Sequence, residues 1–145
     1  MVVLVKVAAC VFISTLSLNA GAHCFKLAAE SFGVNQNILM AIAQVESGYN
    51  ENALNINKNK TFDIGIMQIN SIHLNVLSKI GLKQDNLLDP CTNIIVGAWL
   101  LKEATYRENG DVWRGVGRYH SATPALAQKY IEKVQVSFGK INGKY

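Results

Sequence analysis

Residues 35–48 decide the expected fold, and they read Asn-Gln-Asn-Ile-Leu-Met-Ala-Ile-Ala-Gln-Val-Glu-Ser-Gly. Asn35 has a side chain suited to capping a helix N-terminus, and Gly48 is a common residue at a helix end. The apolar residues between them recur at the spacing of one helix face. These are Ile38, Leu39, Ile42 and Ala43. The sequence therefore predicts an amphipathic helix over residues 36–47.

A glutamic acid continues the apolar stripe of this helix. Glu46 lies seven residues after Leu39, which places both side chains on the same face. Burial and the negative end of the helix dipole both raise the pKa of a carboxyl group. A carboxylic acid that stays protonated near neutral pH is what cleavage of a glycosidic bond needs as general acid. The alternative is a structural Glu46 that reaches solvent or pairs with a nearby lysine.

Upstream of this helix, the first 22 residues have the composition of an export signal. Lys6 is the only charge among the first 25 residues, an apolar run covers 7–18, and Ala20-Gly21-Ala22 follows. This order is typical of a secretory signal peptide that is cleaved after the small residues. The alternative is a retained membrane anchor, but the run is shorter than the roughly 20 apolar residues of a spanning helix. We expect a signal peptide over 1–22 and one domain over 23–145.

The cysteine count agrees with export. The 145 residues include three cysteines, and Cys10 lies within the predicted signal peptide. The remaining Cys24 and Cys91 should form one disulfide in an exported protein, the alternative being two buried thiols. Closing the loop between residues 24 and 91 would stabilise the fold by about 4 kcal/mol in the chain-entropy model.

Downstream of residue 48, most segments predict further helices. Asp89-Pro90 and Thr123-Pro124 each combine a capping residue with a proline at the first helical position. Residues 49–61 are polar and predict a loop, and residues 62–70 are compatible with either a strand or a turn. We expect a mainly α, single compact domain with a small β or irregular element around residues 62–70. The expected helices cover 24–32, 36–47, 71–80, 90–108, 112–119 and 124–138.

The segment over 63–70 reads Asp-Ile-Gly-Ile-Met-Gln-Ile-Asn. Gly65 permits a close backbone approach, and polar Gln68 and Asn70 alternate with apolar neighbours. The wall of a sugar-binding cleft needs this mixture, because amides bind hydroxyl and acetamide groups while apolar atoms cover the faces of the rings. The alternative is an ordinary strand whose two polar side chains face water.

Three separated motifs together resemble the soluble-type lytic transglycosylases, which share the α+β lysozyme-like fold. They are Val-Glu-Ser-Gly at 45–48, Gly-Ile-Met-Gln-Ile-Asn at 65–70 and Gly-Arg-Tyr-His-Ser at 117–121. Asp-Pro-Cys at 89–91 and Thr-Pro at 123–124 are similar to the small specialised members. Those members accompany secretion systems, conjugation machines and pili in Gram-negative bacteria. The resemblance covers nearly all of residues 23–145.

The resemblance implies a peptidoglycan lytic transglycosylase that cleaves the bond between N-acetylmuramic acid and N-acetylglucosamine. Glu46 is then the catalytic acid and base, and the product is a 1,6-anhydro sugar formed without water. Five residues are expected to contact substrate by their positions in the motifs: Ser47, Met67, Gln68, Asn70 and Tyr119.

Asp63 supports an alternative, a lysozyme-type muramidase. It lies 17 residues after Glu46, where the resemblance to animal-type lysozymes places a second carboxylate. Such an enzyme hydrolyses the same bond with two carboxylates. Those lysozymes carry several disulfides whereas this chain has cysteines for one, so the transglycosylase is favoured. Asp63 stays a possible second carboxylate, the alternative being a structural residue that caps a loop.

Composition and resemblance also limit cofactors and partners. The three histidines share no metal-ligand spacing, so we expect neither a metal nor another cofactor. A net charge of +4 is too small to indicate nucleic acid. We expect a periplasmic monomer that acts on glycan strands and belongs to a trans-envelope secretion, conjugation or pilus apparatus. A catalytically silent glycan-binding scaffold is the remaining alternative, and the intact Glu46 argues against it.

Overall fold

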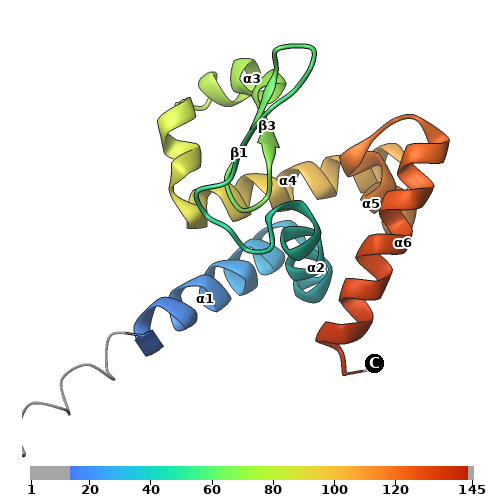
Figure 1. Cartoon of the computed structure of the whole chain (residues 1–145), viewed down its shortest axis with the longest axis horizontal. Helices are drawn as coiled ribbons and strands as arrows, with labels where there is room; N and C mark the ends of the chain where they lie inside the picture. Colours follow the sequence, from blue (N-terminus) through green and yellow to red (C-terminus); the bar gives the residue numbers. More distant parts are fainter. Residues whose placement is uncertain (1–13, 144–145) are drawn as a thin grey trace, which may run out of the picture.

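The computed structural model describes residues 14–143 (Figure 1). Its α-helices are α1 (Ser14–Phe32), α2 (Gln36–Ser47), α3 (Leu74–Ser78), α4 (Pro90–Arg107), α5 (Val112–His120) and α6 (Pro124–Ile141). Two short 3-10 helices are η1 (Ser71–His73) and η2 (Gln84–Leu88). The strands are β1 (Leu54–Ile56), β2 (Phe62–Ile64) and β3 (Ile69–Asn70). The predicted class, mainly α with a small β element, is confirmed.

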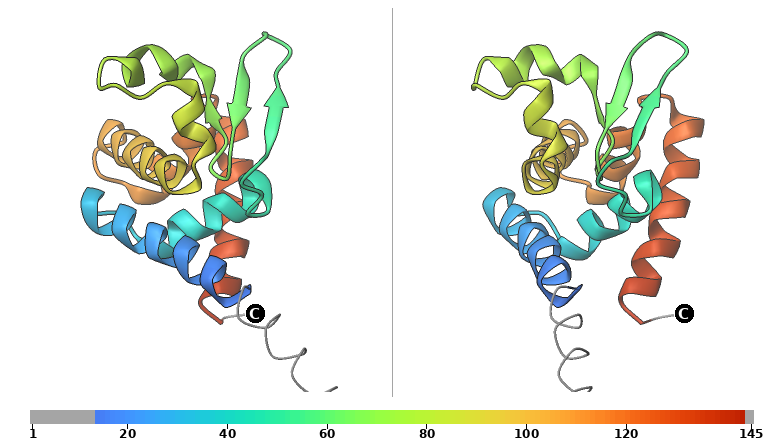
Figure 2. Two further views of the ribbon diagram at one scale, coloured as in Figure 1. Left: turned by 90° about the vertical axis from the view of Figure 1, so that its left-hand side faces the viewer. Right: turned by 60° about the vertical axis from the view of Figure 1, so that its left-hand side comes forward.

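The long helices form one body, and the sheet stands beside them. Helix α2 packs against α1 and α6, while α4 packs against α1 and α5 (Figure 1). The sheet is antiparallel in the order β1-β2-β3, with Asp63 paired to Asn70 across its last two strands. The β1–β2 hairpin and α3 project to one side of the long helices (Figure 2).

Local capping explains where the helices begin. The Asn35 side chain accepts hydrogen bonds from the backbone N–H groups of residues 37 and 38, and it starts α2 as predicted. Asp89 and Asp111 cap α4 and α5 in the same way. Thr123 precedes Pro124 at the start of α6, but its side chain makes no capping hydrogen bond. Proline geometry rather than the predicted hydroxyl cap therefore begins α6.

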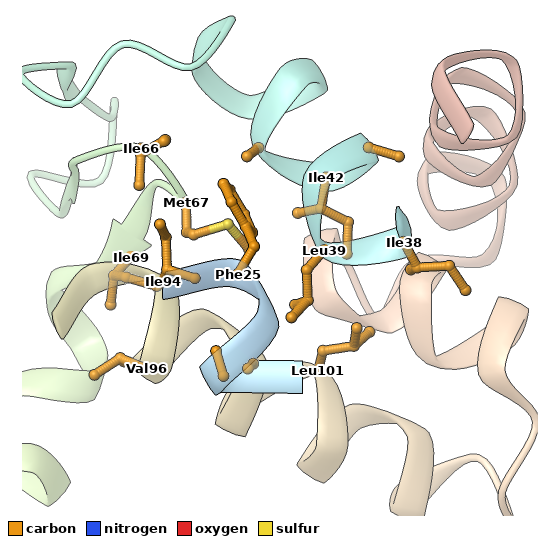
Figure 3. Close-up of a cluster of buried hydrophobic side chains, with 14 of the residues drawn as sticks. Phe25, Ile38, Leu39, Ile42, Ile66, Met67, Ile69, Ile94, Val96 and Leu101 are labelled. Atoms are coloured by element: carbon orange, nitrogen blue, oxygen red, sulfur yellow. The ribbon is translucent and has the colours of Figure 1, made fainter. Parts of the chain in front are cut away.

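The core lies where α2, α4 and the sheet meet (Figure 3). Leu39 and Ile42 of α2 are fully buried there, as the stripe on 36–47 predicts. The Met67 side chain lies between the sheet and α4 and packs on Gly97. A Cβ atom at position 97 would lie 2.8 Å from the terminal carbon of Met67. Glycine at 97 therefore lets the sheet approach the helices closely.

Three segment predictions need correction. The loop expected over 49–61 contains β1, whose three residues are all exposed and are held by pairing with β2. Residues 62–70 are neither one strand nor one turn but two short strands joined by a turn. The helix expected over 24–32 begins at Ser14 and runs unbroken past Ala22.

The signal peptide stays a prediction. Residues 1–13 of the predicted segment, including Cys10, lie outside the described part. Within residues 14–143, no helix is long and apolar enough to cross a membrane.

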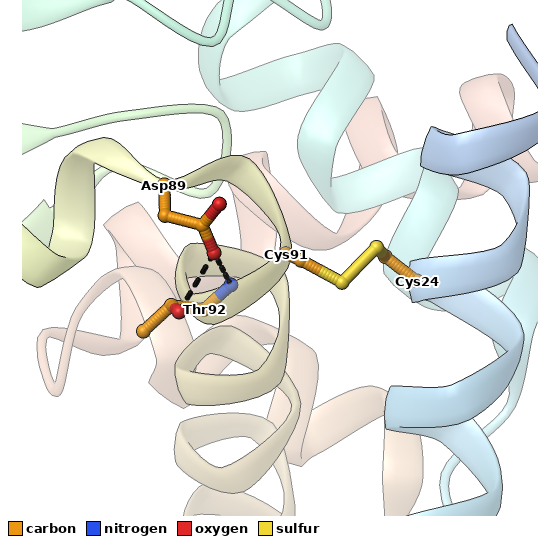
Figure 4. Close-up of a disulfide and its surroundings, with 4 residues drawn as sticks. All are labelled: Cys24, Asp89, Cys91 and Thr92. Atoms are coloured by element: carbon orange, nitrogen blue, oxygen red, sulfur yellow. Dashed lines mark hydrogen bonds between the residues drawn. A yellow bond between two sulfur atoms is a disulfide. The ribbon is translucent and has the colours of Figure 1, made fainter. Parts of the chain in front are cut away.

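The predicted disulfide is confirmed. Cys24 of α1 is bonded to Cys91 in the first turn of α4 (Figure 4). Beside it, the backbone N–H and the hydroxyl of Thr92 donate to Asp89, and these bonds lower the pKa of that carboxyl group. The N-terminus of α4 is thus fixed by one cap and one covalent bond.

Candidate active site

A polar cleft of about 320 Å³ lies between the sheet and the long helices. It brings together five of the predicted site residues: Glu46, Asp63, Gln68, Asn70 and Tyr119. The other lining side chains come from the β1–β2 turn, η1, α4 and the end of α5: Asn57, Ile72, His73, Leu100 and His120.

Glu46 lies in the last turn of α2 on the helical side of the cleft. Its Oε1 accepts a hydrogen bond of 2.5 Å from the hydroxyl of Tyr130. Burial is the main cause that raises the pKa of Glu46 to about 7. The Tyr130 hydrogen bond lowers this pKa, and the negative charge of Asp63 raises it further. The direction predicted from the helix pattern agrees, and Glu46 is able to hold a proton near neutral pH.

Tyr130 is a site residue that the sequence does not single out, since the sequence predicts it only as part of the helix over 124–138. Its side chain is buried in α6, and burial together with the nearby Glu46 raises the pKa of its phenol. The ring of His120 stacks flat on the ring of Tyr130 with centroids 4.5 Å apart. The hydroxyl that reaches Glu46 is thus a protonated donor held between two helices.

Asp63 faces the same cleft from β2. Its Oδ2 accepts from the Asn57 side-chain amide at 2.9 Å, and its Oδ1 accepts from that of Asn70 at 2.7 Å. Both alternatives for Asp63 have structural support, because it fixes the hairpin and also lines the cleft.

Tyr119 supports the cleft from α5. Its hydroxyl donates to the backbone carbonyl of Met67 at 2.9 Å. Burial, with the charges of Glu46 and Asp63, raises the pKa of this phenol well above its ordinary value. Tyr119 therefore ties α5 to the sheet as a neutral donor while its ring lines the cleft.

Two expected substrate contacts need correction. The Met67 side chain is fully buried in the core, so it has no surface to offer a sugar. Ser47 is not among the residues that line the cleft, and its hydroxyl donates to the carbonyl of Ile66 at 2.8 Å. Both residues hold the site together, because they join the end of α2 and the core to the turn before β3.

Gln68 and Asn70 line the cleft as predicted, with their amides already engaged in the protein. Gln68 has a left-handed backbone with φ of 50°, and its amide donates to the carbonyl of Gly65 at 2.9 Å. It also accepts from Asn55 of β1. The Asn70 side chain accepts from the Ile72 N–H and thereby caps η1. These bonds fix the orientation of the amides that face the cleft.

Asn93 is a second residue without a sequence-based prediction. It is fully buried in α4, donates to the carbonyls of Ile64 and Leu87, and accepts from the Met67 N–H, each at 2.9 Å. A Cβ atom at Gly65 would lie 2.4 Å from its amide nitrogen, and Gly65 has φ of +75°. Glycine is required at 65 on both grounds. This buried amide fixes the turn that carries Gln68.

No group of three or more histidine, cysteine, aspartate or glutamate side chains within residues 14–143 is arranged to hold a metal ion. The cleft instead combines a protonatable carboxylic acid, a second carboxylate, amides and tyrosines. A helix-borne glutamic acid that faces a small sheet across a polar cleft defines the class of lysozyme-like enzymes that cleave glycosidic bonds.

Comparison with known proteins identifies the family within this class. The model of the transglycosylase SLT domain matches residues 23–137, and the chain belongs to this family. It is a peptidoglycan lytic transglycosylase, as its motifs predict. The fold is similar to that of an inactive mutant of lytic transglycosylase Slt from Pseudomonas aeruginosa, with a TM-score of 0.68 and 16% identity. That match covers 84% of this chain and 24% of the larger structure.

Several curated relatives are small proteins. Invasion protein IagB of Salmonella typhimurium is 36% identical over 134 residues, which cover 88% of this chain and 83% of IagB. Protein IpgF of Shigella flexneri is 37% identical over 109 residues, which cover 74% and 71% of the two chains. The X polypeptide of Escherichia coli strain K12 is 38% identical over 99 residues, which cover 68% and 58%.

Proposed function

We propose that the protein cleaves the β-1,4 bond between N-acetylmuramic acid and N-acetylglucosamine without water and with one acid/base residue, Glu46. The observation that carries this proposal is the environment of Glu46. Its burial between α2 and α6 raises its pKa to about 7, and one tyrosine donates to it. Near neutral pH such a group exists in both protonation states, so it can give a proton and later take one.

The steps follow from that property. Protonated Glu46 donates its proton to the glycosidic oxygen, the bond to the anomeric carbon breaks, and the acetamide oxygen of the muramic acid bonds to that carbon. The Glu46 carboxylate then removes the proton of the C6 hydroxyl. The C6 oxygen attacks the anomeric carbon and displaces the acetamide oxygen, which closes the 1,6-anhydro ring. Glu46 ends protonated, as it began.

The surrounding residues support the two states of Glu46. The Tyr130 hydroxyl stabilises the carboxylate formed after the first proton transfer, because it already donates to Oε1. Tyr119, Gln68 and Asn70 line the cleft and would contact the glycan strand. Asp63 acts through its charge, which raises the pKa of Glu46. The second candidate function is hydrolysis by two carboxylates, in which Asp63 takes part directly. The position of Asp63 in the same cleft as Glu46 supports this candidate.

Product analysis separates the two chemistries. Purified peptidoglycan is digested in water enriched in heavy oxygen, and the products are examined by mass spectrometry. The proposal predicts anhydro-muropeptides without heavy oxygen, whereas hydrolysis gives reducing ends that contain it. The variant Glu46→Gln should give no product, and Glu132→Gln, which changes an exposed carboxylate of α6, should match the wild type. Reducing ends from the wild type, or undiminished product from Glu46→Gln, would refute the mechanism.

We also propose that the protein is exported by cleavage after Ala22 and works in the periplasm as a monomer. There it would open the wall locally for a secretion, conjugation or pilus apparatus. The composition of residues 1–22 supports export. The likeness to a protein named for invasion supports a link to such a machine.

Genetic complementation tests this role. In a strain that lacks the gene, assembly of the apparatus should fall, and the wild-type gene should restore it. A gene with Glu46→Gln should not. Equal rescue by both genes would instead favour the silent scaffold.

A further inference from the structure

A second groove follows the contact between α2 and α6, and its lining includes Val45, the neighbour of Glu46 in the sequence. Its volume is about 580 Å³, and its walls come from the end of α2 and from the last turns of α6. The two helices are antiparallel, since Glu46 contacts Tyr130 while Asn37 bonds to Asn142 just beyond α6. The groove therefore runs from the last turn of α2, which carries Glu46, toward the C-terminal end of α6.

The chemistry of this groove differs from that of the cleft. Lys133 and Lys140 line it, and its lining residues include no carboxylate. Neither lysine forms an ion pair with any residue in the described part of the chain. Apolar Val45 and Val136 line the same groove. It thus combines apolar surface with two unpaired ammonium groups and suits an acidic ligand with small apolar side chains.

Tyr49 gives the groove a fixed polar group. It follows α2 with a left-handed backbone, φ of 64°, which a bulky residue adopts only at a cost. Its ring packs edge-on against the buried Phe25, with centroids 6.4 Å apart. Burial raises the pKa of its phenol, so the hydroxyl stays a hydrogen-bond donor. This placement holds a neutral donor in the groove that also contains the two lysines.

The Lys133 end of the groove lies near the site of chemistry. Lys133 is one helical turn after Tyr130, the residue that donates to Glu46. Burial and the positive charge of Lys133 lower the pKa of His120, which lines the cleft. Lys140 follows Lys133 by two turns, about 10 Å along the helix axis. An extended peptide of about four residues spans about 13 Å, which is enough to contact both lysines.

We propose that this groove, lined by Lys133, Lys140 and Tyr49, binds the acidic peptide stem carried by the muramic acid next to the cleaved bond. The proposal rests on the proposed function, because the sugar must lie in the cleft for its stem to enter the groove. The two ammonium groups bind carboxylates of the stem, the Tyr49 hydroxyl donates to a peptide carbonyl, and the valines contact alanine methyl groups. The protein therefore prefers peptide-bearing glycan over bare glycan.

Rates on two substrates test the proposal. One is intact peptidoglycan, and the other is the same material stripped of its stems by an N-acetylmuramoyl-L-alanine amidase. The double variant Lys133→Gln, Lys140→Gln should lose about fivefold in rate on intact peptidoglycan, as two solvent-exposed ion contacts predict. It should match the wild type on stripped glycan. The control Lys102→Gln, Lys129→Gln removes the same charge from other exposed positions and should change neither rate. An equal loss on both substrates, or no loss on either, would overturn the proposal.

A binding measurement keeps this inference separate from the mechanism. Glu46→Gln protein is titrated with a disaccharide that carries its stem and with the same disaccharide without it. Amide NMR shifts at residues 133–140 should appear only with the stem, and the double lysine variant should weaken this binding about fivefold. Absence of these shifts would refute the groove even if anhydro products form. Their presence in a protein that releases only reducing ends would refute the mechanism and keep the groove.

Discussion

The two walls of the cleft each hold one carboxyl group, and the two groups differ in their burial and their hydrogen bonds. On the helical wall, Glu46 of α2 faces α6 and, among the residues of 14–143, accepts a side-chain hydrogen bond from Tyr130 alone. On the sheet wall, both oxygens of Asp63 accept amide hydrogens, from Asn57 and Asn70. The packing of long helices desolvates the first group, whereas a polar hairpin solvates the second with its own side chains. This difference in environment supports the proposal that Glu46, and not Asp63, is the acid.

The largest effect should follow from removing the acid of the helical wall. Glu46→Gln keeps the size and the hydrogen-bonding capacity of the side chain but cannot transfer a proton. We expect the release of anhydro products to fall by about 10³-fold, within the range for loss of general acid–base catalysis. Initial rates on purified peptidoglycan measure this effect, with Glu132→Gln as control. A fall of less than tenfold would show that the helical wall does not supply the acid.

The same substitution should change how stability depends on pH. The folded state holds the Glu46 proton up to about pH 7, while the ordinary value is 4.5. Stability due to the protonated group is therefore complete below the ordinary pKa and is lost as pH rises through about 7. Above that pH the buried charge costs about 3 kcal/mol in free energy of unfolding, and glutamine avoids this cost.

Urea unfolding at about pH 4 and about pH 8.5 measures this difference. Relative to the wild type, Glu46→Gln should gain about 3 kcal/mol in free energy of unfolding between the two conditions. Glu132→Gln, on an exposed side chain, provides the reference. Equal changes for both variants would mean that the helical wall does not desolvate Glu46.

Much of the difference between the helical wall and the sheet wall can be predicted from the sequence, and part of it cannot. The helix over 36–47 and the offset of Glu46 depend on local caps and on periodicity, which short stretches encode. The disulfide follows from a cysteine count. The contact of Tyr130 with Glu46 joins residues 84 positions apart and depends on how α2 packs on α6. Packing of this kind leaves no local pattern.

The sheet wall was less predictable than the helical wall for a physical reason. Strand β1 is exposed at all three positions, so its sequence lacks the alternation of apolar residues that would predict a strand. Its conformation depends on pairing with β2. Buried Asn93 looks like an ordinary polar residue in a helix until the turn at Gly65 is placed against it. Met67 and Ser47 follow the family motif, but their side chains serve the core and the backbone instead of facing the cleft.

A smaller effect should follow from removing the hydrogen bond that Tyr130 donates to Glu46. Tyr130→Phe loses a hydrogen bond that favours the charged form of Glu46, so the pKa of Glu46 should rise. The pH at which activity declines on the alkaline side should move upward. The rate near neutral pH should fall by about tenfold, as expected for one charge-assisted hydrogen bond. Tyr106→Phe, at an exposed tyrosine of α4, is the matched control. A downward shift would contradict the assigned role of Tyr130.

The smallest effect is expected on the sheet wall. Asp63→Asn removes a negative charge that raises the pKa of Glu46, so the alkaline limit of activity should move downward, opposite to the shift for Tyr130→Phe. The rate should fall by less than about tenfold, below the roughly 10²-fold minimum for a group that takes part in proton transfer. A loss as large as that of Glu46→Gln would refute the proposed difference between the two groups and make Asp63 a second catalytic carboxylate.

The proposed mechanism depends most on the protonation of Glu46, and direct titration of that one side chain tests it. Carboxyl-carbon NMR of protein labelled at glutamate, assigned by the signal that Glu46→Gln removes, follows the group as pH changes. The structure predicts a midpoint of about 7 for the Glu46 carboxyl group. A midpoint near the ordinary value of 4.5 would contradict the proposed role of Glu46 as the acid, because Glu46 would then hold no proton to donate at neutral pH.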